Sequence, residues 1–530
     1  MSRIDLTALQ CAPGASWDLQ SVCLDQTRTA LREEIWMWIR SADVNKTAEI
    51  MWLTGVAGAG KSTVAHTIAQ RCKDEGLLLS CFFFARREEG RDGLQMLFST
   101  IAHDLASDAN VAEQIGISIE HDRSIARASP SRQFRAFILD IAHWYPVDNP
   151  VVIIMDGLDE VCNCERLLLI LRDEIPKLPG NFRFLVSSRP EPTIVSYISK
   201  KAHVHSCTMD IDGQANLEDI AVYAQFKLEE LAMLQNMGSD WPGDELSKAF
   251  ACRAEGLFVW VSTVCKHLSH AADPAAQLVS LISNSSPMGL TTEAKMDKTY
   301  TTILESCDWE DEAFVNGYGL FMGAIMAVKN PLSASAFQSL YYTRLTLPVR
   351  RVLRPLSSLL IGFTDEDETQ PIRILHQSLR DFLTVRAANS PKSLAFFLEE
   401  KQHNERLAII CLDIMNQRLQ PDIAGTGYLK SELEGIPESA GSHASEELWY
   451  ACRFWIDHIV EVKAPVSDLV DAMHTFFSTK AVLLWMELVT SKGQFQKLAK
   501  ARQWLQVRHQ IDLLFLLWLN MIVSVSENIT

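Results

Sequence analysis

The stretch from Gly55 to Ser62 reads Gly-Val-Ala-Gly-Ala-Gly-Lys-Ser and fits the pattern G-x-x-x-x-G-K-[ST]. Glycines let backbone N–H groups turn inward and approach phosphate oxygens. A helix that begins near Lys61 would add the positive end of its dipole. Lys61 would bind the β- and γ-phosphates, and the Ser62 hydroxyl would ligate Mg²⁺. The pattern therefore predicts a site for a nucleoside triphosphate and magnesium.

The context of this turn supports the prediction. The apolar run 50–53 indicates a buried strand before it, and residues 62–73 have the pattern of a helix after it. A phosphate-binding turn of this kind needs both neighbours. The residues expected to contact the nucleotide are Gly55, Val56, Ala57, Gly58, Ala59, Gly60, Lys61, Ser62 and Thr63.

Acidic residues follow a second predicted strand, Val151–Met155. A carboxylate at the carboxyl end of a central strand is well placed to hold hydrated Mg²⁺, so we assign Asp156, with Ser62, to the metal. Asp159 and Glu160 are candidates to orient an attacking water. The alternative interpretation is an acidic turn that only faces solvent.

An arginine follows the next predicted strand, 182–186, in the sequence Ser187-Ser188-Arg189-Pro190. Ligands of open α/β sheets bind at the carboxyl ends of the strands, so the three features should meet in one crevice. We therefore expect Arg189 to face the γ-phosphate and to act with Asp159 and Glu160 in catalysis. Taken alone, an arginine at such a position is more often a surface residue.

The elements that must position these residues alternate in type. Strands are predicted at 50–53, 77–84, 151–155, 182–186 and 203–209, with helical patterns between them. This order implies a mostly parallel five-stranded sheet covered on both faces. After residue 212 the pattern becomes helical, except for two apolar runs, 359–363 and 372–375, which we predict to form a hairpin. The fold class is therefore an α/β P-loop NTPase domain followed by a largely helical region.

Composition limits the remaining possibilities. The 530 residues correspond to three or four domains at ~150 residues each. There are 49 Lys and Arg against 66 Asp and Glu, a net charge of −17. A chain this acidic is a poor general binder of nucleic acid or anionic membranes, so we expect neither as a partner. Cysteines within apolar runs and the lack of a secretory signal favour a cytoplasmic protein.

The motifs together resemble the NACHT domain of the STAND class of signalling NTPases. The resemblance rests on the P-loop, on Gly157 directly after Asp156 with acids at 159 and 160, and on Ser188-Arg189-Pro190. Residues 81–86 and 133–134 resemble the fungal, NLR-like branch, which is also called nephrocystin-3-like. In that branch a Gly-Thr-Arg triplet precedes the domain, and Arg28 occupies its place here, which implies a contact with nucleotide. The resemblance extends over about residues 20–510.

Downstream motifs resemble the helical and winged-helix domains of that family. Residues 255–260 resemble a helix behind the nucleotide site, and residues 332–340 and 374–383 resemble the winged helix. The resemblance implies that His376 reaches the β-phosphate of bound ADP; a structural histidine between strand and helix is the alternative. The expected domains are a leader and helix (1–47), a NACHT domain (48–212), a helical domain (213–300), a winged helix (301–390) and a second helical region (391–530).

The family usually carries an N-terminal effector domain and C-terminal repeats. The sequence matches neither, so we expect a chain that lacks both and is truncated before the repeats. In the family the repeats sense the ligand and the effector domain gives the output, so this expectation concerns those two functions. It leaves nucleotide binding untouched.

The resemblance implies a nucleotide-gated switch. ADP would hold the chain closed, exchange to ATP–Mg²⁺ would open a surface for self-association, and slow hydrolysis would reset it, in signalling such as innate defence or non-self recognition. Two alternatives remain: a nucleotide-stabilised scaffold or regulator of full-length relatives that never hydrolyses, and a constitutive NTPase. The expected cofactors are ATP/ADP with Mg²⁺, and GTP is the alternative, because a P-loop contacts the phosphates only and leaves the base open.

Overall fold

The computed structural model describes residues 9–43, 46–86, 88–144, 149–161, 163–238, 240–283, 291–342, 347–364, 367–421, 423, 425–426, 443–463, 466–492 and 504. They form two compact units, 1–296 and 297–530. The finer domain boundaries expected from the sequence stay predictions. The expected truncation concerns a C-terminal segment, 505–530, that lies outside the described residues.

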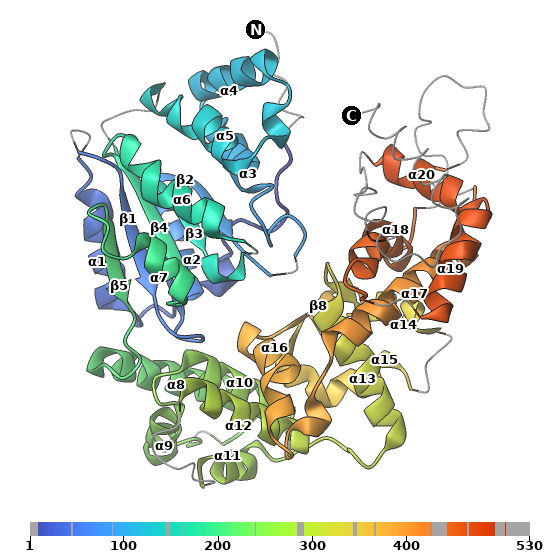
Figure 1. Cartoon of the computed structure of the whole chain (residues 1–530). Coiled ribbons are helices and arrows are strands. Elements are labelled where there is room, and N and C mark those ends of the chain that lie inside the picture. Colours follow the sequence, from blue (N-terminus) through green and yellow to red (C-terminus); the bar gives the residue numbers. More distant parts are fainter. Residues whose placement is uncertain are drawn as a thin grey trace. The chain divides into compact units, whose positions relative to one another are not determined.

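The first unit is built on a five-stranded parallel sheet (Figure 1). Its strands are β1 (Glu49–Thr54), β2 (Leu78–Phe83), β3 (Val151–Asp156), β4 (Phe182–Ser188) and β5 (Val204–Thr208). Their spatial order is β2-β3-β4-β1-β5, and every neighbouring pair is parallel. The predicted sheet is thereby confirmed strand by strand.

Helices cover both faces of the sheet, so the alternating side chains of the inner strands are buried on either side, whereas the edge strand β5 is largely exposed. Ile50 and Trp52 pack on one face with α3 (Leu97–Leu105), α5 (Pro130–Phe134), α6 (Glu165–Asp173) and α7 (Pro192–Ile198). Met51 and Leu53 pack on the other face with α1 (Thr29–Arg40) and α2 (Lys61–Asp74). The near-continuous apolar runs of the strands are the consequence.

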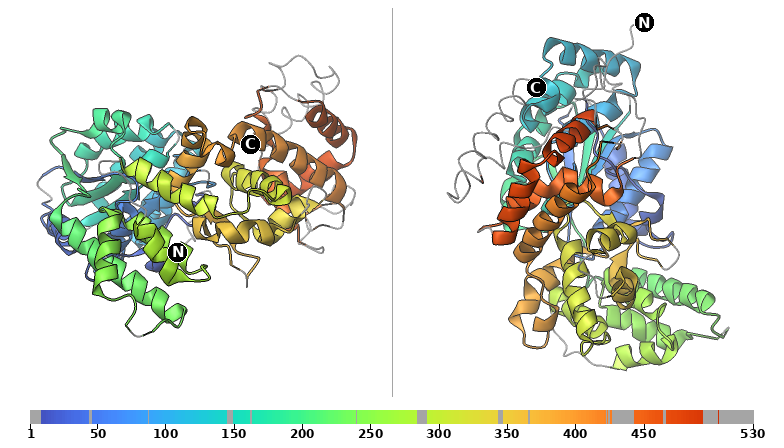
Figure 2. Two further views of the ribbon diagram at one scale, coloured as in Figure 1. Left: turned by 90° about the horizontal axis from the view of Figure 1, so that it is seen from below. Right: turned by 90° about the vertical axis from the view of Figure 1, so that its right-hand side faces the viewer.

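Helices follow the sheet in the same unit. They are α8 (Gln214–Leu234), α9 (Asp244–Ala254), α10 (Phe258–Leu268) and α11 (Pro274–Ser283), coloured green in Figures 1 and 2. A further helix, α4 (Ala109–His121), comes earlier in the chain and packs with α3. The two units divide within α12 (Thr292–Glu305).

The second unit is helical around a small sheet. Strands β6 (Leu332–Ser333), β8 (Pro371–Ile374) and β7 (Leu360–Ile361) lie in that order and pair antiparallel. The predicted hairpin is confirmed, since Leu360 pairs with Ile374. The helices of this unit are α13 (Glu312–Ala327), α14 (Ala334–Leu340), α15 (Val349–Leu353), α16 (Gln377–Thr384), α17 (Glu400–Arg418), α18 (Glu446–Ile459), α19 (Ser467–Ser478) and α20 (Ala481–Ser491).

Among the described residues, no helix combines the length and the apolar character that a membrane crossing requires.

Candidate nucleotide-binding site

The carboxyl ends of three neighbouring strands carry the predicted site. Thr54 of β1 lies beside Ser188 of β4, and Met155 of β3 lies beside Val186. The strand β4 therefore separates the P-loop strand from the strand that ends in Asp156. The residues after these strands, including Arg189, emerge at the same edge.

The P-loop turns between β1 and α2 with the backbone that the pattern predicted. Gly58 has φ +80°, a conformation that side chains rarely adopt, and a Cβ there would collide with Val259 of α10. Gly60 caps the 14-residue helix α2, which begins at Lys61. The amino end of this helix, with Ser62 and Thr63 in its first turn, points its dipole at the strand edge.

The Lys61 ammonium lies over the loop. Its Nζ donates hydrogen bonds to the carbonyl oxygens of Gly55 at 2.9 Å and Val56 at 3.0 Å. Burial lowers the pKa of Lys61, and the nearby carboxylates of Asp159 and Asp156 oppose this shift. A partly desolvated cation that faces carboxylates is well suited to receive phosphate oxygens.

Asp156 is buried, with 4% of its surface exposed. Ser187 of β4 donates a short hydrogen bond to its carboxylate, and the Ser187 hydroxyl accepts one from the backbone N–H of Gly157 at 3.0 Å. Burial raises the pKa of Asp156, while hydrogen bonds from Ser187 and Ser62 and the charge of Lys61 oppose the shift. The two predicted metal residues, Ser62 and Asp156, therefore lie near each other, close enough for the hydroxyl to lower the pKa of the carboxyl.

These two oxygen donors fit Mg²⁺. That ion prefers oxygen ligands, keeps several waters and commonly uses one or two protein groups together with phosphates. Ser62 and Asp156 supply a hydroxyl and a carboxylate at the amino end of α2. No group of three or more metal-ligating His, Cys, Asp or Glu side chains occurs in the part of the chain that the structure describes.

Asp159 and Arg189 form an ion pair. The Arg189 backbone N–H donates to Asp159 Oδ1 at 2.9 Å, and its Nε lies 3.1 Å from Asp159 Oδ2. Asp159 therefore holds the arginine at the strand edge in this state. The catalytic roles expected of these two residues stay predictions, and the structure brings both to the edge where Lys61 and Asp156 lie.

Glu160 follows in a short 3₁₀ turn, Leu158–Glu160. Its carboxylate accepts a hydrogen bond from the backbone N–H of Arg86 at 3.0 Å, and the Arg86 guanidinium donates to the carbonyl of Asp159 at 2.9 Å. Burial raises the pKa of Glu160 to about 7, with Asp159 and Asp156 adding to the shift. A carboxylate of this pKa suits a general base near neutral pH.

Arg28 lies behind the P-loop. This buried residue has φ +56° and precedes α1, and its guanidinium donates to the carbonyl of Ala59 at 2.9 Å. The guanidinium carbon is 4.9 Å from the centre of the Phe258 ring. Burial lowers the pKa of Arg28, and the negative charge of Asp219 on α8 opposes this shift. Arg28 thus joins the P-loop to α8 and α10; its expected contact with nucleotide stays a prediction.

The start of α10 packs on the loop. Val259 occupies the space beside Gly58, and Phe258 lies beside Gly60. The turn before them is held by Asn216, whose amide donates to the carbonyls of Ile211 at 2.6 Å and Gly256 at 3.0 Å. The segment that resembled a family helix therefore contacts the nucleotide loop directly.

Sequence reasoning missed several residues of this site. They are Ser187 as the partner of Asp156, Arg86 as the partner of Glu160, and Asp219 and Phe258 around Arg28. A serine directly after a strand was a signal for Ser187. Its partner could be named only from the strand order, which places β4 beside β3 and so brings Ser187 to Asp156.

His376 belongs to the second unit. It caps α16: its Nδ1 accepts a hydrogen bond from the backbone N–H of Ser378 at 3.2 Å and lies 2.7 Å from the Ser378 hydroxyl. That hydroxyl is 2.8 Å from the Tyr300 hydroxyl. The capping bonds fix the ring at a strand-to-helix junction, and its expected contact with ADP stays a prediction.

Residues 29–189 match the family model described as nephrocystin 3, N-terminal, which is less than half of the chain. The sequence matches none of the curated proteins with which it was compared. Similar solved structures include Drosophila ORC bound to DNA, with 12% identity and a TM-score of 0.30 over 72% of this chain and 94% of that one. C. elegans PCH-2 has 15% identity and a TM-score of 0.28, and the match covers 50% of this chain and 70% of that one. The Aeropyrum pernix ORC1 protein in complex with DNA has 12% identity and a TM-score of 0.27, and the match covers 66% of this chain and 88% of that one.

The expectation that nucleic acid is excluded as a partner is corrected. Two of these similar structures are described as complexes with DNA. Net charge was a poor criterion, because it sums the whole surface whereas phosphate contacts depend on local basic groups. The exclusion is withdrawn, and DNA binding remains a property of those two proteins, since likeness at these TM-scores carries no argument about function.

The parallel sheet, the P-loop before α2 and the family match over 29–189 lead to one assignment. The first unit contains an α/β P-loop NTPase domain of the nucleotide-binding type, similar to the N-terminal domain of nephrocystin 3.

Proposed function

We propose that this protein is a nucleotide-gated switch of the STAND class that binds ATP and ADP and hydrolyses ATP slowly. The observation that carries the proposal is the convergence of the P-loop, with Lys61 Nζ over it, and the buried Asp156 at the edge where Asp159, Glu160 and Arg189 also emerge. A signalling role, for example in innate defence, and a cytoplasmic location belong to this proposal by resemblance.

In this proposal the glycine-rich loop wraps the phosphates and Lys61 neutralises them. Ser62 and Asp156 hold Mg²⁺, which supplies charge stabilisation at the phosphates when bound. Glu160 accepts a proton from the attacking water, and Arg189 leaves Asp159 for the γ-phosphate. The role of His376 in retaining ADP is part of the same proposal.

Two features of the site support slow turnover. Glu160 is partly protonated near pH 7 because burial raises its pKa to about 7, and its carboxylate already accepts a bond from Arg86. Arg189 is paired with Asp159. Both groups must be released or deprotonated before hydrolysis, and this requirement favours a switch over a constitutive NTPase.

The first experiment identifies the nucleotide that the protein retains. The chain is purified without added nucleotide and denatured, and the released small molecules are separated by chromatography. Stoichiometric ADP is the expected result. GDP would change the base but keep the switch, whereas rapid ATP turnover without retained nucleotide would favour the constitutive NTPase.

A second measurement separates a switch from a scaffold. Light scattering gives the mass of the Glu160→Gln chain with ADP and with ATP–Mg²⁺. We expect self-association in ATP only, because the variant should hold ATP without cleaving it. An identical mass in both states would contradict the switch.

A further inference from the structure

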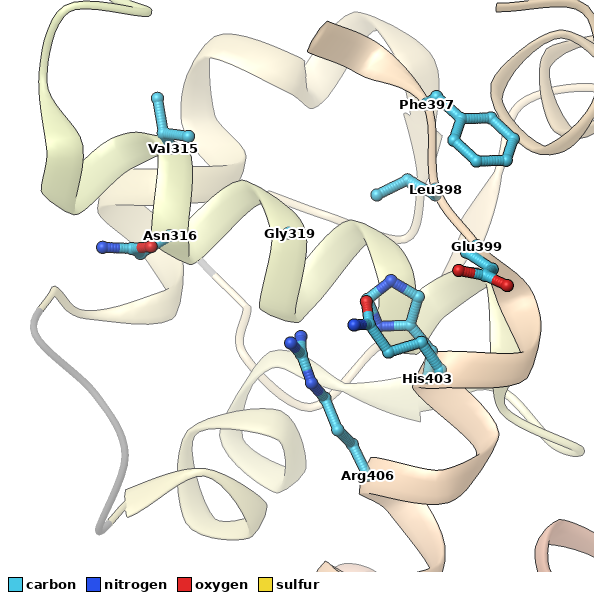
Figure 3. Close-up of a pocket in the computed structure, with 9 residues that line it drawn as sticks. Val315, Asn316, Gly319, Phe397, Leu398, Glu399, His403 and Arg406 are labelled. Carbon is cyan, nitrogen blue, oxygen red and sulfur yellow. The ribbon is translucent and has the colours of Figure 1, made fainter. Parts of the chain in front are cut away.

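A cavity of about 350 Å³ lies in the second unit, between α13 and the start of α17. Figure 3 shows the side chains that line it, from residues 315, 316 and 319 of α13 and from 397–406 around the start of α17. This volume is at the lower end of the range for small-molecule sites. Nothing in the nucleotide chemistry of the first unit uses it.

The cavity exists because α13 carries glycine where a larger side chain would fill the space. A Cβ on Gly319 would meet no atom within 4 Å. One turn further, at Gly323, the His403 ring occupies the corresponding space and closes the cavity at that end. The Tyr318 hydroxyl donates to the carbonyl of Phe396 at 2.8 Å, which ties the wall before α17 to α13.

Polar groups on one face of α17 line the cavity. Glu399, Gln402, His403 and Arg406 recur at the spacing of successive helical turns. Among the described residues, the side chains of Gln402 and Arg406, and of Asn316 opposite, have no hydrogen-bond or ion-pair partner. His403 is 3% exposed, and its Nδ1 is buried without a partner.

A buried donor or acceptor without a partner costs about 1–3 kcal/mol. Among these side chains that cost applies to His403 Nδ1, since Asn316 and Gln402 are exposed and Arg406 is half-buried. In Figure 3 the Arg406 guanidinium and the His403 ring both reach from α17 toward α13. Arg406 is the cation among the lining residues, and the amides of Asn316 and Gln402 add neutral donors. Val315, Phe397 and Leu398 supply apolar surface.

The charges of the lining cancel in sum, and the half-buried guanidinium of Arg406 makes its own end of the cavity attractive to an anion. Glu399 is the carboxylate of the lining, and it is exposed to solvent, which weakens its repulsion. Burial lowers the pKa of His403 to about 4, so the ring is neutral at pH 7 and can donate or accept one hydrogen bond. Glu400 is paired with Arg380 at 3.1 Å.

We propose that this cavity binds a small organic anion, with its carboxylate or phosphate on Arg406 and Gln402 and a short apolar body against Val315 and Leu398. The proposal is independent of nucleotide binding, because all of its residues lie in the second unit.

The test uses fluorinated probes and ¹⁹F NMR on the full chain. The probes are 4-fluorobenzoate, 4-fluorophenyl phosphate and the neutral 4-fluorobenzamide, and the Lys61→Ala background weakens the phosphate site of the P-loop. We expect millimolar or tighter binding of at least one anion and at least tenfold weaker binding of the amide. The stronger anion tells whether carboxylate or phosphate is preferred.

Substitutions locate the bound probe. Gly319→Leu should fill the cavity and abolish binding without unfolding the helix, because the position has open space and leucine favours helices. Arg406→Gln should weaken binding about tenfold or more, since it removes a charge-assisted pair. Glu399→Gln should strengthen it, and Lys401→Gln, an exposed change on the same helix, should leave it unchanged.

The proposal is overturned if neither anion binds at 10 mM, a concentration of the order of the weakest specific ligands. It is also overturned if the amide binds as well as the anions, or if Gly319→Leu retains binding while circular dichroism shows a folded chain. Because the background already lacks Lys61, failure here says nothing against the nucleotide switch.

Discussion

Lys61 places a half-buried positive charge over the P-loop. Its ammonium contacts two loop carbonyls and faces two carboxylates, so phosphate oxygens would find a preorganised positive group. We predict that Lys61→Ala weakens ADP binding by about 10- to 100-fold, the value of a lost charge-assisted hydrogen bond. Titration calorimetry measures the effect, with Lys73→Ala at the exposed end of α2 as the control. Equal affinity of Lys61→Ala and the parent chain would refute the assignment.

Glu160 gives hydrolysis a predictable pH dependence. A general base must be deprotonated, and burial raises the pKa of Glu160 to about 7. The rate of ATP hydrolysis should therefore rise from pH 6 to 8 and level off above. Glu160→Gln should lower the rate about 100-fold or more and remove this rise, while ADP affinity is retained. Phosphate release at constant ionic strength measures both, and an unchanged profile in the variant would exclude Glu160 as the base.

Arg28 fixes one peptide of the P-loop. The peptide group is planar, so the guanidinium that holds the Ala59 carbonyl on one side also fixes the direction of the Gly60 N–H on the other. Arg28→Gln should weaken ADP binding about tenfold, and Arg28→Lys should recover only part, because lysine lacks the planar fork. Arg40→Gln, at the exposed end of α1, is the matched control. Binding unchanged in Arg28→Gln would reduce Arg28 to a packing residue.

At the scale of elements, the P-loop and α10 are fitted to each other. A Cβ at Gly58 would collide with Val259, and the φ of +80° adds strain of about 1–2 kcal/mol. Gly76 has a similar φ, +69°, in open space, so Gly76→Ala isolates the strain. We predict that Gly58→Ala lowers the free energy of unfolding by about 1–3 kcal/mol more than Gly76→Ala does.

A double variant tests the cause of that difference. Val259→Ala should remove the clash, so Gly58→Ala should cost less in the Val259→Ala background than in the parent chain. Urea unfolding followed by tryptophan fluorescence measures each value. If the two glycine substitutions cost the same in the parent chain, α10 does not press on the P-loop.

At the scale of the whole molecule, two compact units divide at residues 296 and 297. The nucleotide site lies within the first unit, so ligand binding should stabilise that unit directly. Calorimetry should resolve two unfolding transitions, and ADP at 100 times its Kd should stabilise one of them by about 2.7 kcal/mol. At the same ADP concentration the stabilisation of Lys61→Ala should fall to about 0.4–1.4 kcal/mol, because its affinity is about 10- to 100-fold weaker. A single transition that ADP shifts as a whole would show that the units unfold together.

Much of the fold and part of the site were predictable because their signals are local. Apolar runs marked four of the five parallel strands, the more polar β5 being the exception, and the spacing of glycine, lysine and serine marked the turn before α2. The acids after β3 and Arg189 after β4 were also placed at the correct edge. These features depend on residues within about ten positions of one another, where period and composition are decisive.

The sequence by itself thus determined which segments form the strands, where the glycine-rich turn lies and which side chains reach the edge of the sheet. Only the tertiary structure decided that Ser187 bonds Asp156, that Arg86 holds Glu160, and that Arg28 joins Ala59 to α8 and α10. These partners lie 31 to 74 positions apart in the first three contacts. Such contacts depend on strand order and on how helices pack, which arise from long-range burial of apolar surface and leave no periodic trace in the chain.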